Sequence, residues 1–90
     1  MKFEWDTQKS RVNKAKHGID FDAAKEIWND MNRLEIQTSY PIENRRILIG
    51  KIGERLWSAV YTQRKNATRI ISVRRARKRE ANLYEKKGNG

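Results

Sequence analysis

The fold is decided by residues 45–75, which read RRILIGKIGERLWSAVYTQRKNATRIISVRR. Three runs within this stretch combine β-branched and aromatic residues with polar ones in alternation, as half-buried strands do. The connections between them, Gly53-Glu54 and Lys65-Asn66, are typical of tight hairpin turns. Two such turns in succession predict an antiparallel meander. The three runs are residues 45–52, 56–64 and 68–74.

Two helices are predicted on the N-terminal side of this meander. Residues 2–5 alternate polar and apolar side chains like a short strand. Asp6 then caps a helix over residues 7–17, which Gly18 closes. Asp20 caps a second helix, whose core face has apolar residues at helical spacing. Those residues are Phe21, Ala24, Ile27, Trp28 and Met31.

The rest of the chain completes an α+β pattern. A weak strand is predicted over residues 33–37, a loop over residues 38–44 and a final helix over residues 75–86. We therefore predict one α+β domain over residues 1–90, an antiparallel meander of about four strands packed with two N-terminal helices and one C-terminal helix. The inner face of the last helix is predicted to hold Ala76, Leu83 and Tyr84.

Alternation also assigns the side chains of the last strand to two faces of the sheet. It predicts that Arg69 and Arg74 lie on opposite faces. One face is expected to carry Arg69, Ile71, Val73 and Arg75, and the other Thr68, Ile70, Ser72 and Arg74.

Net charge is the most informative property of the composition. The chain has 21 Lys and Arg residues against 11 Asp and Glu, a formal charge of +10, and residues 64–90 contain ten of the basic and two of the acidic residues. Such concentrated like charge opposes compaction and is typical of proteins that bind a polyanion. The alternative is a solvated surface that keeps the protein soluble.

The residues that the sequence lacks exclude other classes of function. With no Cys and one His, disulfides, cysteine nucleophiles and thiolate metal sites are ruled out. No run approaches the roughly 20 apolar residues of a membrane span, and no leader peptide is recognisable. We expect a soluble cytoplasmic protein without a metal, a cofactor or a membrane partner.

Arginines gather where the predicted strands end, at Arg64, Arg69, Arg74 and Arg75. The planar guanidinium group pairs bidentately with phosphate and stays charged. These arginines are therefore candidate phosphate contacts. The alternative is that they protect exposed strand edges from pairing with another sheet.

The start of the last helix carries three more cations, Arg77, Lys78 and Arg79. The helix macrodipole is positive there, so each cation costs a few tenths of a kcal/mol, up to about 1 kcal/mol. A bound polyanion or an acidic partner chain would offset this cost.

Two motifs resemble those of a known family. Residues 3–21 contain Phe-Glu-Trp-Asp and then Asn-x-x-Lys-His-Gly-Ile-x-Phe, which resembles the opening of BrnT-type toxins of bacterial type II toxin–antitoxin systems. Residues 61–76 contain Tyr-Thr-x-Arg and Arg-Ile-Ile-Ser-x-Arg-Arg-Ala, similar to the second signature of the same family. The resemblance spans nearly the whole chain and is weakest through residues 29–44.

This resemblance implies a RelE-like fold and a metal-independent endoribonuclease that cleaves mRNA, on the ribosome or free, and arrests translation. It also implies a bacterial cytoplasmic protein that is neutralised by a cognate antitoxin with a ribbon-helix-helix domain. The complex would repress its own operon, so operator DNA is a partner only through the antitoxin. Tyr61 stands where a His is common in that family, so a role for that His is not available here.

Metal-free RNA cleavage uses the 2′-hydroxyl of the substrate as nucleophile, and it needs a base, an acid and cations around the phosphate. Arg64, Arg69 and Arg74 are the candidate catalytic cations. His17 is the candidate acid or base, because histidine changes its charge near neutral pH. The alternative for His17 is that it caps the carbonyl groups at the end of its helix.

Eight residues are candidate RNA contacts, and some have a structural alternative. Trp5 either stacks on an unpaired base or anchors the core beside Phe3. Tyr84 either donates to phosphate or belongs to the inner face of the last helix. Glu80 either pairs with a neighbouring arginine or is exposed. The candidate contacts are Trp5, Lys9, Lys16, Arg75, Arg77, Lys78, Arg79 and Tyr84.

Two further functions stay open from the residues alone. A non-catalytic module that binds RNA or DNA shares the charge pattern and differs from the enzyme only in failing to cleave. An interaction protein would use the same basic surface to meet an acidic partner. Cleavage of RNA separates the first hypothesis from these two.

Overall fold

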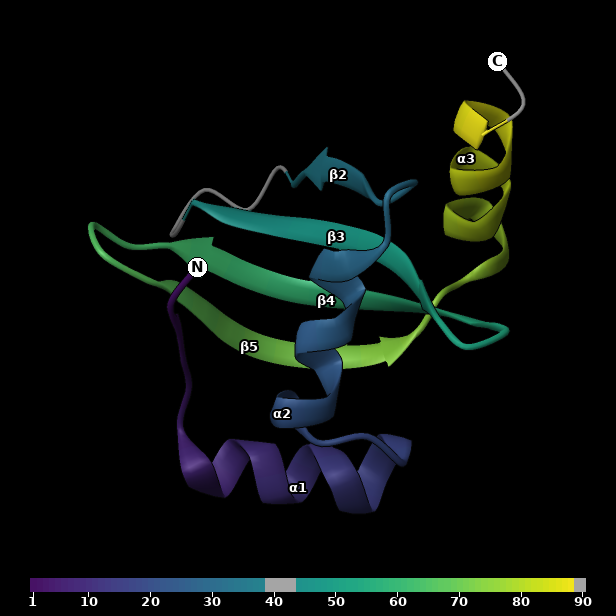
Figure 1. The fold of residues 1–90 in the computed structure, drawn as a ribbon. Coiled ribbons are helices and arrows are strands. Elements are labelled where there is room, and N and C mark those ends of the chain that lie inside the picture. Colours follow the sequence, from purple (N-terminus) through teal and green to yellow (C-terminus); the bar gives the residue numbers. More distant parts are fainter. Residues whose placement is uncertain (39–43, 89–90) are drawn as a thin grey trace.

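The computed structural model describes residues 1–38 and 44–88 and confirms the predicted α+β fold (Figure 1). Helices lie at both ends of the chain and the meander lies between them. The loop predicted over residues 38–44 falls largely outside the described residues. The elements are β1 (Phe3–Glu4), α1 (Thr7–His17), α2 (Phe21–Ala24), the 3-10 helix η1 (Lys25–Asn29), β2 (Leu34–Gln37), β3 (Arg45–Ile52), β4 (Arg55–Gln63), β5 (Thr68–Arg75) and α3 (Lys78–Gly88).

The five strands form one sheet in the order β1-β5-β4-β3-β2. Strands β2 to β5 are the predicted antiparallel meander. The short N-terminal strand β1 joins the same sheet and pairs in parallel with β5, with Phe3 opposite Thr68 and Glu4 opposite Arg69. The sheet is therefore mixed, and its first strand brings a carboxylate next to Arg69.

The N-terminal helices begin and end at the predicted caps. The Asp6 carboxylate accepts two backbone N–H groups of the first turn of α1, and Asp20 accepts one in α2. Gly18 closes α1 with a φ of 81°. After one turn α2 tightens into η1, which ends at Asn29, so Met31 is 92% exposed instead of facing the core as predicted. In the described part of the chain, no helix combines the length and the apolar character that crossing a membrane requires.

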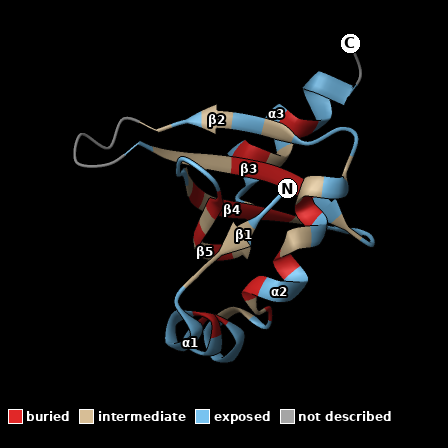
Figure 2. Cartoon of the chain, turned by 60° about the vertical axis from the view of Figure 1, so that its left-hand side comes forward, coloured by how far each residue is buried: buried red, intermediate tan, exposed pale blue. Residues whose placement is uncertain are grey.

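Helices α2 and η1 cross one face of the sheet, which we call the covered face (Figure 1). Phe21 and Ile27 from these helices pack against Leu48, Ala59 and Val73 from the central strands, and all five side chains are buried. Buried residues concentrate on β3, β4 and β5 and on the helices that contact them (Figure 2). We call the opposite side of the sheet the open face, although α3 covers the part of it that carries the buried Ser58.

A β-bulge changes the faces predicted for the last strand. The pairing of β4 with β5 shifts between Val60 and Tyr61, which leaves Ile71 as an extra residue in β5. Because one inserted residue reverses the alternation beyond it, Arg69 and Arg74 lie on the same face and not on opposite ones. The covered face of β5 carries Thr68, Ile70, Val73 and Arg75, and the open face carries Arg69, Ser72 and Arg74.

The last helix begins three residues later than predicted, because Arg75 still pairs with β4. The Glu80 carboxylate accepts the backbone N–H of Arg77 at 2.8 Å, which is half of a capping box. Glu80 and Tyr84 form the buried side of α3. Leu83, predicted on that side, is 42% exposed.

Helix α1 protects the edge of β5 beyond the short strand β1. The buried Asn13 side chain receives the Val73 N–H at 3.1 Å and donates to the Val73 carbonyl at 2.9 Å and to the Ile19 carbonyl at 2.8 Å. The carboxamide thus replaces a partner strand and fixes α1 against the sheet.

Candidate functional site

Three residues on adjacent strands form a row across the open face of the sheet, and Glu4 of β1 lies at its end. Arg45 of β3 is the register partner of Thr62 of β4. Arg69 of β5 is the partner of Thr62 on one side and of Glu4 on the other. Two strand spacings, about 10 Å, separate the backbones of the two arginines. We call Arg45, Thr62 and Arg69 the arginine row.

The arginine row lines a hollow of about 470 Å³ at one end of the sheet. Lys9 of α1 and Arg64 of the β4–β5 turn also line it, so four cations surround one space. The described residues that line the hollow include no acidic side chain. They are Lys9, Asn44, Arg45, Thr62, Gln63, Arg64, Arg69 and Ile71.

A second hollow, of about 260 Å³, continues from the first between α1 and β5, since both are lined by Lys9 and Ile71. Lys16 and His17 lie in this part, together with Ser72 of the open face. The two hollows thus adjoin at Lys9 and Ile71, and we call them together the cationic groove. It brings together five of the predicted site residues, namely Lys9, Lys16, His17, Arg64 and Arg69.

An ion pair fixes Arg69 at the border of the groove. Its Nη1 lies 3.0 Å from Oε2 of Glu4, and both side chains are about one-third exposed. A guanidinium group has five N–H donors. The pair with Glu4 therefore orients Arg69 and leaves further donors for an anion.

The structure engages Arg74 in a different way. Its Nη1 and Nη2 donate to the two carboxylate oxygens of Glu80 at 2.7 and 2.9 Å. Glu80 also accepts the Ser58 hydroxyl at 2.9 Å. Hydrogen bonds from Arg74 above all, with those from Arg77 and Ser58, lower the pKa of Glu80 to about 2 against the opposing effect of burial. Arg74 thus ties α3 to the sheet.

Two predicted RNA contacts serve the fold. The Trp5 ring packs edge-on against Phe21, with 6.4 Å between ring centroids, and Trp5 and Phe3 both pack against the core cluster. Tyr84 is 6% exposed and its hydroxyl donates to Asp30 at 2.6 Å. Burial and this bond raise the pKa of Tyr84 to about 12. The structure brings neither residue to the cationic groove.

The remaining cations predicted to bind RNA lie outside the groove. The Arg75 guanidinium is on the covered face, 5.5 Å from the centroid of the Trp57 ring, in a cation–π contact. Arg77, Lys78 and Arg79 are exposed at the start of α3. They extend the positive surface without lining the groove.

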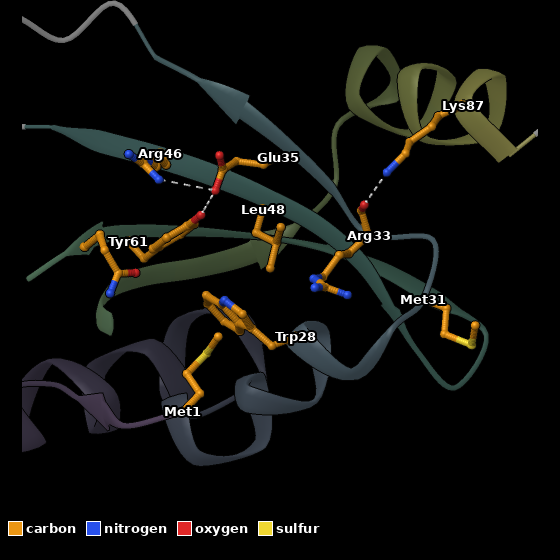
Figure 3. A pocket seen from close by; sticks show the side chains of 10 residues that line it. Met1, Trp28, Met31, Arg33, Glu35, Arg46, Leu48, Tyr61 and Lys87 are labelled. Atoms are coloured by element: carbon orange, nitrogen blue, oxygen red, sulfur yellow. Dashed lines mark hydrogen bonds and ion pairs between the residues drawn. The ribbon is translucent and has the colours of Figure 1, made fainter. Parts of the chain in front are cut away.

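Tyr61 occupies the position at which the family resemblance suggests a His, and its side chain faces away from the groove. It is buried on the covered face, and its hydroxyl donates to Glu35, which also pairs with Arg46 at 3.8 Å (Figure 3). Burial and the bond to Glu35 raise the pKa of Tyr61 well above its usual range. Tyr61 is therefore a neutral structural hydrogen-bond donor.

Three residues at the groove were absent from the predicted site, namely Glu4, Arg45 and Thr62. A signal for two of them was present in the sequence. A two-residue turn at residues 53–54 fixes the register of the whole hairpin, and that register pairs Arg45 with Thr62. The parallel pairing that brings Glu4 to Arg69 has no such local signal.

The groove gathers positively charged side chains around two adjoining hollows. Its cations come from four places in the chain and converge on a partly enclosed space, where charges interact more strongly than in open water. Across the described residues, no three His, Asp or Glu side chains lie together in a way that could hold a metal ion.

Comparison with known proteins agrees with this geometry. Residues 5–80 match the family model described as the ribonuclease toxin BrnT of type II toxin–antitoxin systems. No individually curated protein matches the sequence. The match covers most of the chain, including α1, the arginine row and the start of α3. The chain therefore belongs to the BrnT family of ribonuclease toxins.

Proposed function

We propose that this chain cleaves mRNA in the cationic groove without a metal ion, with the 2′-hydroxyl of the RNA as nucleophile. The observation that carries the proposal is the arginine row, in which two guanidinium groups flank a hydroxyl within a hollow that two further cations line. A phosphodiester is the anion that such an array recognises best. The ribonuclease activity of the family supplies the class of reaction.

In the proposed reaction the 2′-oxygen bonds to phosphorus as its proton passes to water, and the 5′-oxygen leaves and takes a proton from water, which gives a 2′,3′-cyclic phosphate. Negative charge builds on the non-bridging phosphate oxygens as the bond forms. Arg45 and Arg69 stabilise this charge, and Glu4 holds Arg69 in place. Removing one electrostatic donor of this kind typically lowers the rate by about 10²–10³.

His17 has a different position in the groove. It lies eight residues, and so about 12 Å, further along α1 than Lys9. With the scissile phosphate at the arginine row, His17 therefore lies too far along the groove to act as its acid or base, and we assign His17 to a neighbouring phosphate of the same strand near Ser72. Lys9 and Lys16 line the path between these two positions.

The roles of Arg64 and Arg74 follow from their surroundings. We assign Arg64, which is exposed at the β4–β5 turn, to phosphate binding beside the arginine row. We assign Arg74 a structural role. Its two terminal nitrogens are engaged by Glu80, and this ion pair holds α3 against the sheet. The exposed cations Arg77, Lys78 and Arg79 add sequence-independent attraction for RNA.

In the cell, we infer that this cleavage arrests translation in the bacterial cytoplasm, on the ribosome or on free mRNA. The cognate antitoxin, for which we propose a ribbon-helix-helix domain, neutralises the toxin and brings the complex to operator DNA. The family supports the existence of an antitoxin.

The direct test is incubation of the purified chain with mRNA in EDTA, with and without ribosomes. Fragments are expected that end in 2′,3′-cyclic phosphate. Arg69→Ala is expected to lower the cleavage rate by about 10²–10³ while the fold is retained. The matched control is Arg55→Ala, which removes an exposed arginine outside the groove and is expected to leave the rate unchanged.

RNA that stays intact in every condition would refute the enzyme. Binding of RNA without cleavage would instead support a non-catalytic nucleic-acid-binding module. Equal loss of activity in Arg69→Ala and Arg55→Ala would show that overall charge, and not the arginine row, is responsible.

A further inference from the structure

A separate hollow of about 470 Å³ lies on the covered face, beside η1 (Figure 3). Nothing in the proposed reaction uses it. Its lining comes from the N-terminus, η1 and the segment after it, strands β2 to β4 and the end of α3. The residues are Met1, Trp28, Met31, Arg33, Glu35, Arg46, Leu48, Tyr61, Gln63 and Lys87.

The base of this hollow is apolar. Leu48 and Tyr61 are buried, and the partly buried Trp28 ring packs edge-on against Tyr61 with 5.2 Å between ring centroids. Trp28 packs in the same way against Phe3, at 5.0 Å. These contacts hold the indole in place, so the hollow presents a rigid aromatic and aliphatic surface.

The rim of the hollow is cationic. Among the described residues that line it, the one acidic side chain is Glu35, which is already engaged by the Tyr61 hydroxyl and by Arg46. Lys87 donates one hydrogen bond to the Arg33 carbonyl at 2.8 Å, which leaves its charge at the rim beside that of Arg33 (Figure 3). A ligand with carboxylates next to an apolar group complements this arrangement.

Two methionines at the mouth of the hollow are almost fully exposed, Met1 at 86% and Met31 at 92%. Exposed thioether chains are costly to leave in water and adapt their shape to a partner. They are typical of protein-binding surfaces, whereas a nucleic-acid strand would gain little from them.

We propose that this hollow anchors an acidic segment of the protein antitoxin. An apolar side chain of the segment lies on Trp28 and Leu48 between the two methionines, and neighbouring carboxylates pair with Arg33, Arg46 and Lys87. The inference rests on the proposed function, since it assigns the surface by which the toxin is restrained. The high positive charge of the chain favours an acidic partner of this kind.

The position of the hollow also explains how a segment bound there can block the groove. Gln63, at the end of β4, lines both this hollow and the cationic groove. Arg46 lines the hollow while the preceding residue, Arg45, lines the groove, on the other face of β3. A chain that passes around this end of the sheet reaches both spaces, so its acidic residues can compete with RNA for the arginine row.

The test compares binding of the cognate antitoxin by purified toxin variants. Arg33→Glu/Lys87→Glu is expected to weaken binding by at least about 30-fold, because like charges then face each other across the interface. Met31→Asp, at a side chain that contributes little to the fold, is expected to weaken binding by about 10-fold. Both variants are expected to cleave RNA like the wild type and to escape neutralisation in co-expressing cells.

The matched control is Arg11→Glu/Arg55→Glu, which makes the same change in net charge at exposed positions outside both spaces. Antitoxin binding by the hollow variants that equals that of the wild type would overturn the inference. So would a loss of RNA binding with unchanged antitoxin binding, which would make the hollow part of the RNA site. Weakened antitoxin binding in a chain that does not cleave RNA would support the docking surface while refuting the proposed function.

Discussion

The ion pair between Arg74 and Glu80 yields a quantitative prediction for the variant Glu80→Gln. The amide keeps the size of the side chain but removes the charge that both terminal nitrogens of Arg74 contact. The pKa of Glu80 is about 2 in the folded protein against an ordinary value of 4.5. Since each pKa unit corresponds to about 1.4 kcal/mol, ionised Glu80 contributes about 3 kcal/mol to stability at neutral pH.

The sign of the pH dependence follows from the direction of this pKa. A carboxyl group whose pKa is lowered by folding stabilises the protein above its unfolded pKa, and the contribution falls as the pH drops from 4.5 towards 2. We expect Glu80→Gln to lose about 3 kcal/mol of unfolding free energy relative to the wild type at pH 7. At pH 3 the difference should shrink to about 1.4 kcal/mol.

Urea unfolding followed by circular dichroism measures this difference, because urea is uncharged and does not screen the pair. Glu85→Gln is the matched control, since Glu85 is an exposed glutamate of the same helix, and its effect should stay within about 0.5 kcal/mol at both pH values. A difference between wild type and Glu80→Gln that is the same at pH 7 and pH 3 would refute the role assigned to the ion pair.

Three other predictions test the fold and the groove. Asn13→Ala should lower the unfolding free energy by about 3 kcal/mol, because it leaves the buried backbone groups of Val73 without a partner, and thermal or urea unfolding would show it. Gly50→Ala should lower the unfolding free energy by about 1–3 kcal/mol, because the added Cβ would lie 2.9 Å from the Ile27 side chain. Gly88→Ala is the control: its Cβ meets nothing within 4 Å, so the unfolding free energy should not change. A plot of the logarithm of the binding constant for single-stranded RNA against the logarithm of the salt concentration should have a slope of about −3, from the four cations of the larger hollow. Arg69→Ala should make this slope less steep by about 0.7. An unchanged slope in fluorescence-anisotropy titrations would mean that Arg69 does not contact phosphate.

Local signals predicted most of the fold. The caps Asp6 and Asp20 and the closing Gly18 act within one helical turn, so the sequence around them is sufficient to place the N-terminal helices. The turn at residues 53–54 likewise set the register of its hairpin. Interactions of this kind depend on residues that are neighbours in the chain.

The wrong predictions concern structural features that depend on contacts between distant parts of the chain. The bulge at Ile71 moves Arg69 to the face that carries Arg74, and the pattern of residues 68–75 gives no sign of it. The late start of α3 depends on the pairing of Arg75 with β4. Asn13 belongs to a family motif, but the sequence alone assigned it no role, because its hydrogen-bond partner Val73 lies sixty residues away in the chain.

The structure also changes which charges bear on function. The cations Arg77, Lys78 and Arg79 at the positive end of α3 suggested a bound polyanion that would offset their cost. Glu80 supplies a negative charge from within the chain, since its carboxylate accepts the Arg77 N–H at the same helix end. Folding therefore does not require RNA at α3. Arg69 differs, because its ion pair with Glu4 joins one Nη1 to one carboxylate oxygen at 3.0 Å and leaves further N–H donors of the guanidinium group facing the groove. The case for a phosphate ligand consequently depends on the open face of the sheet and not on the terminal helix.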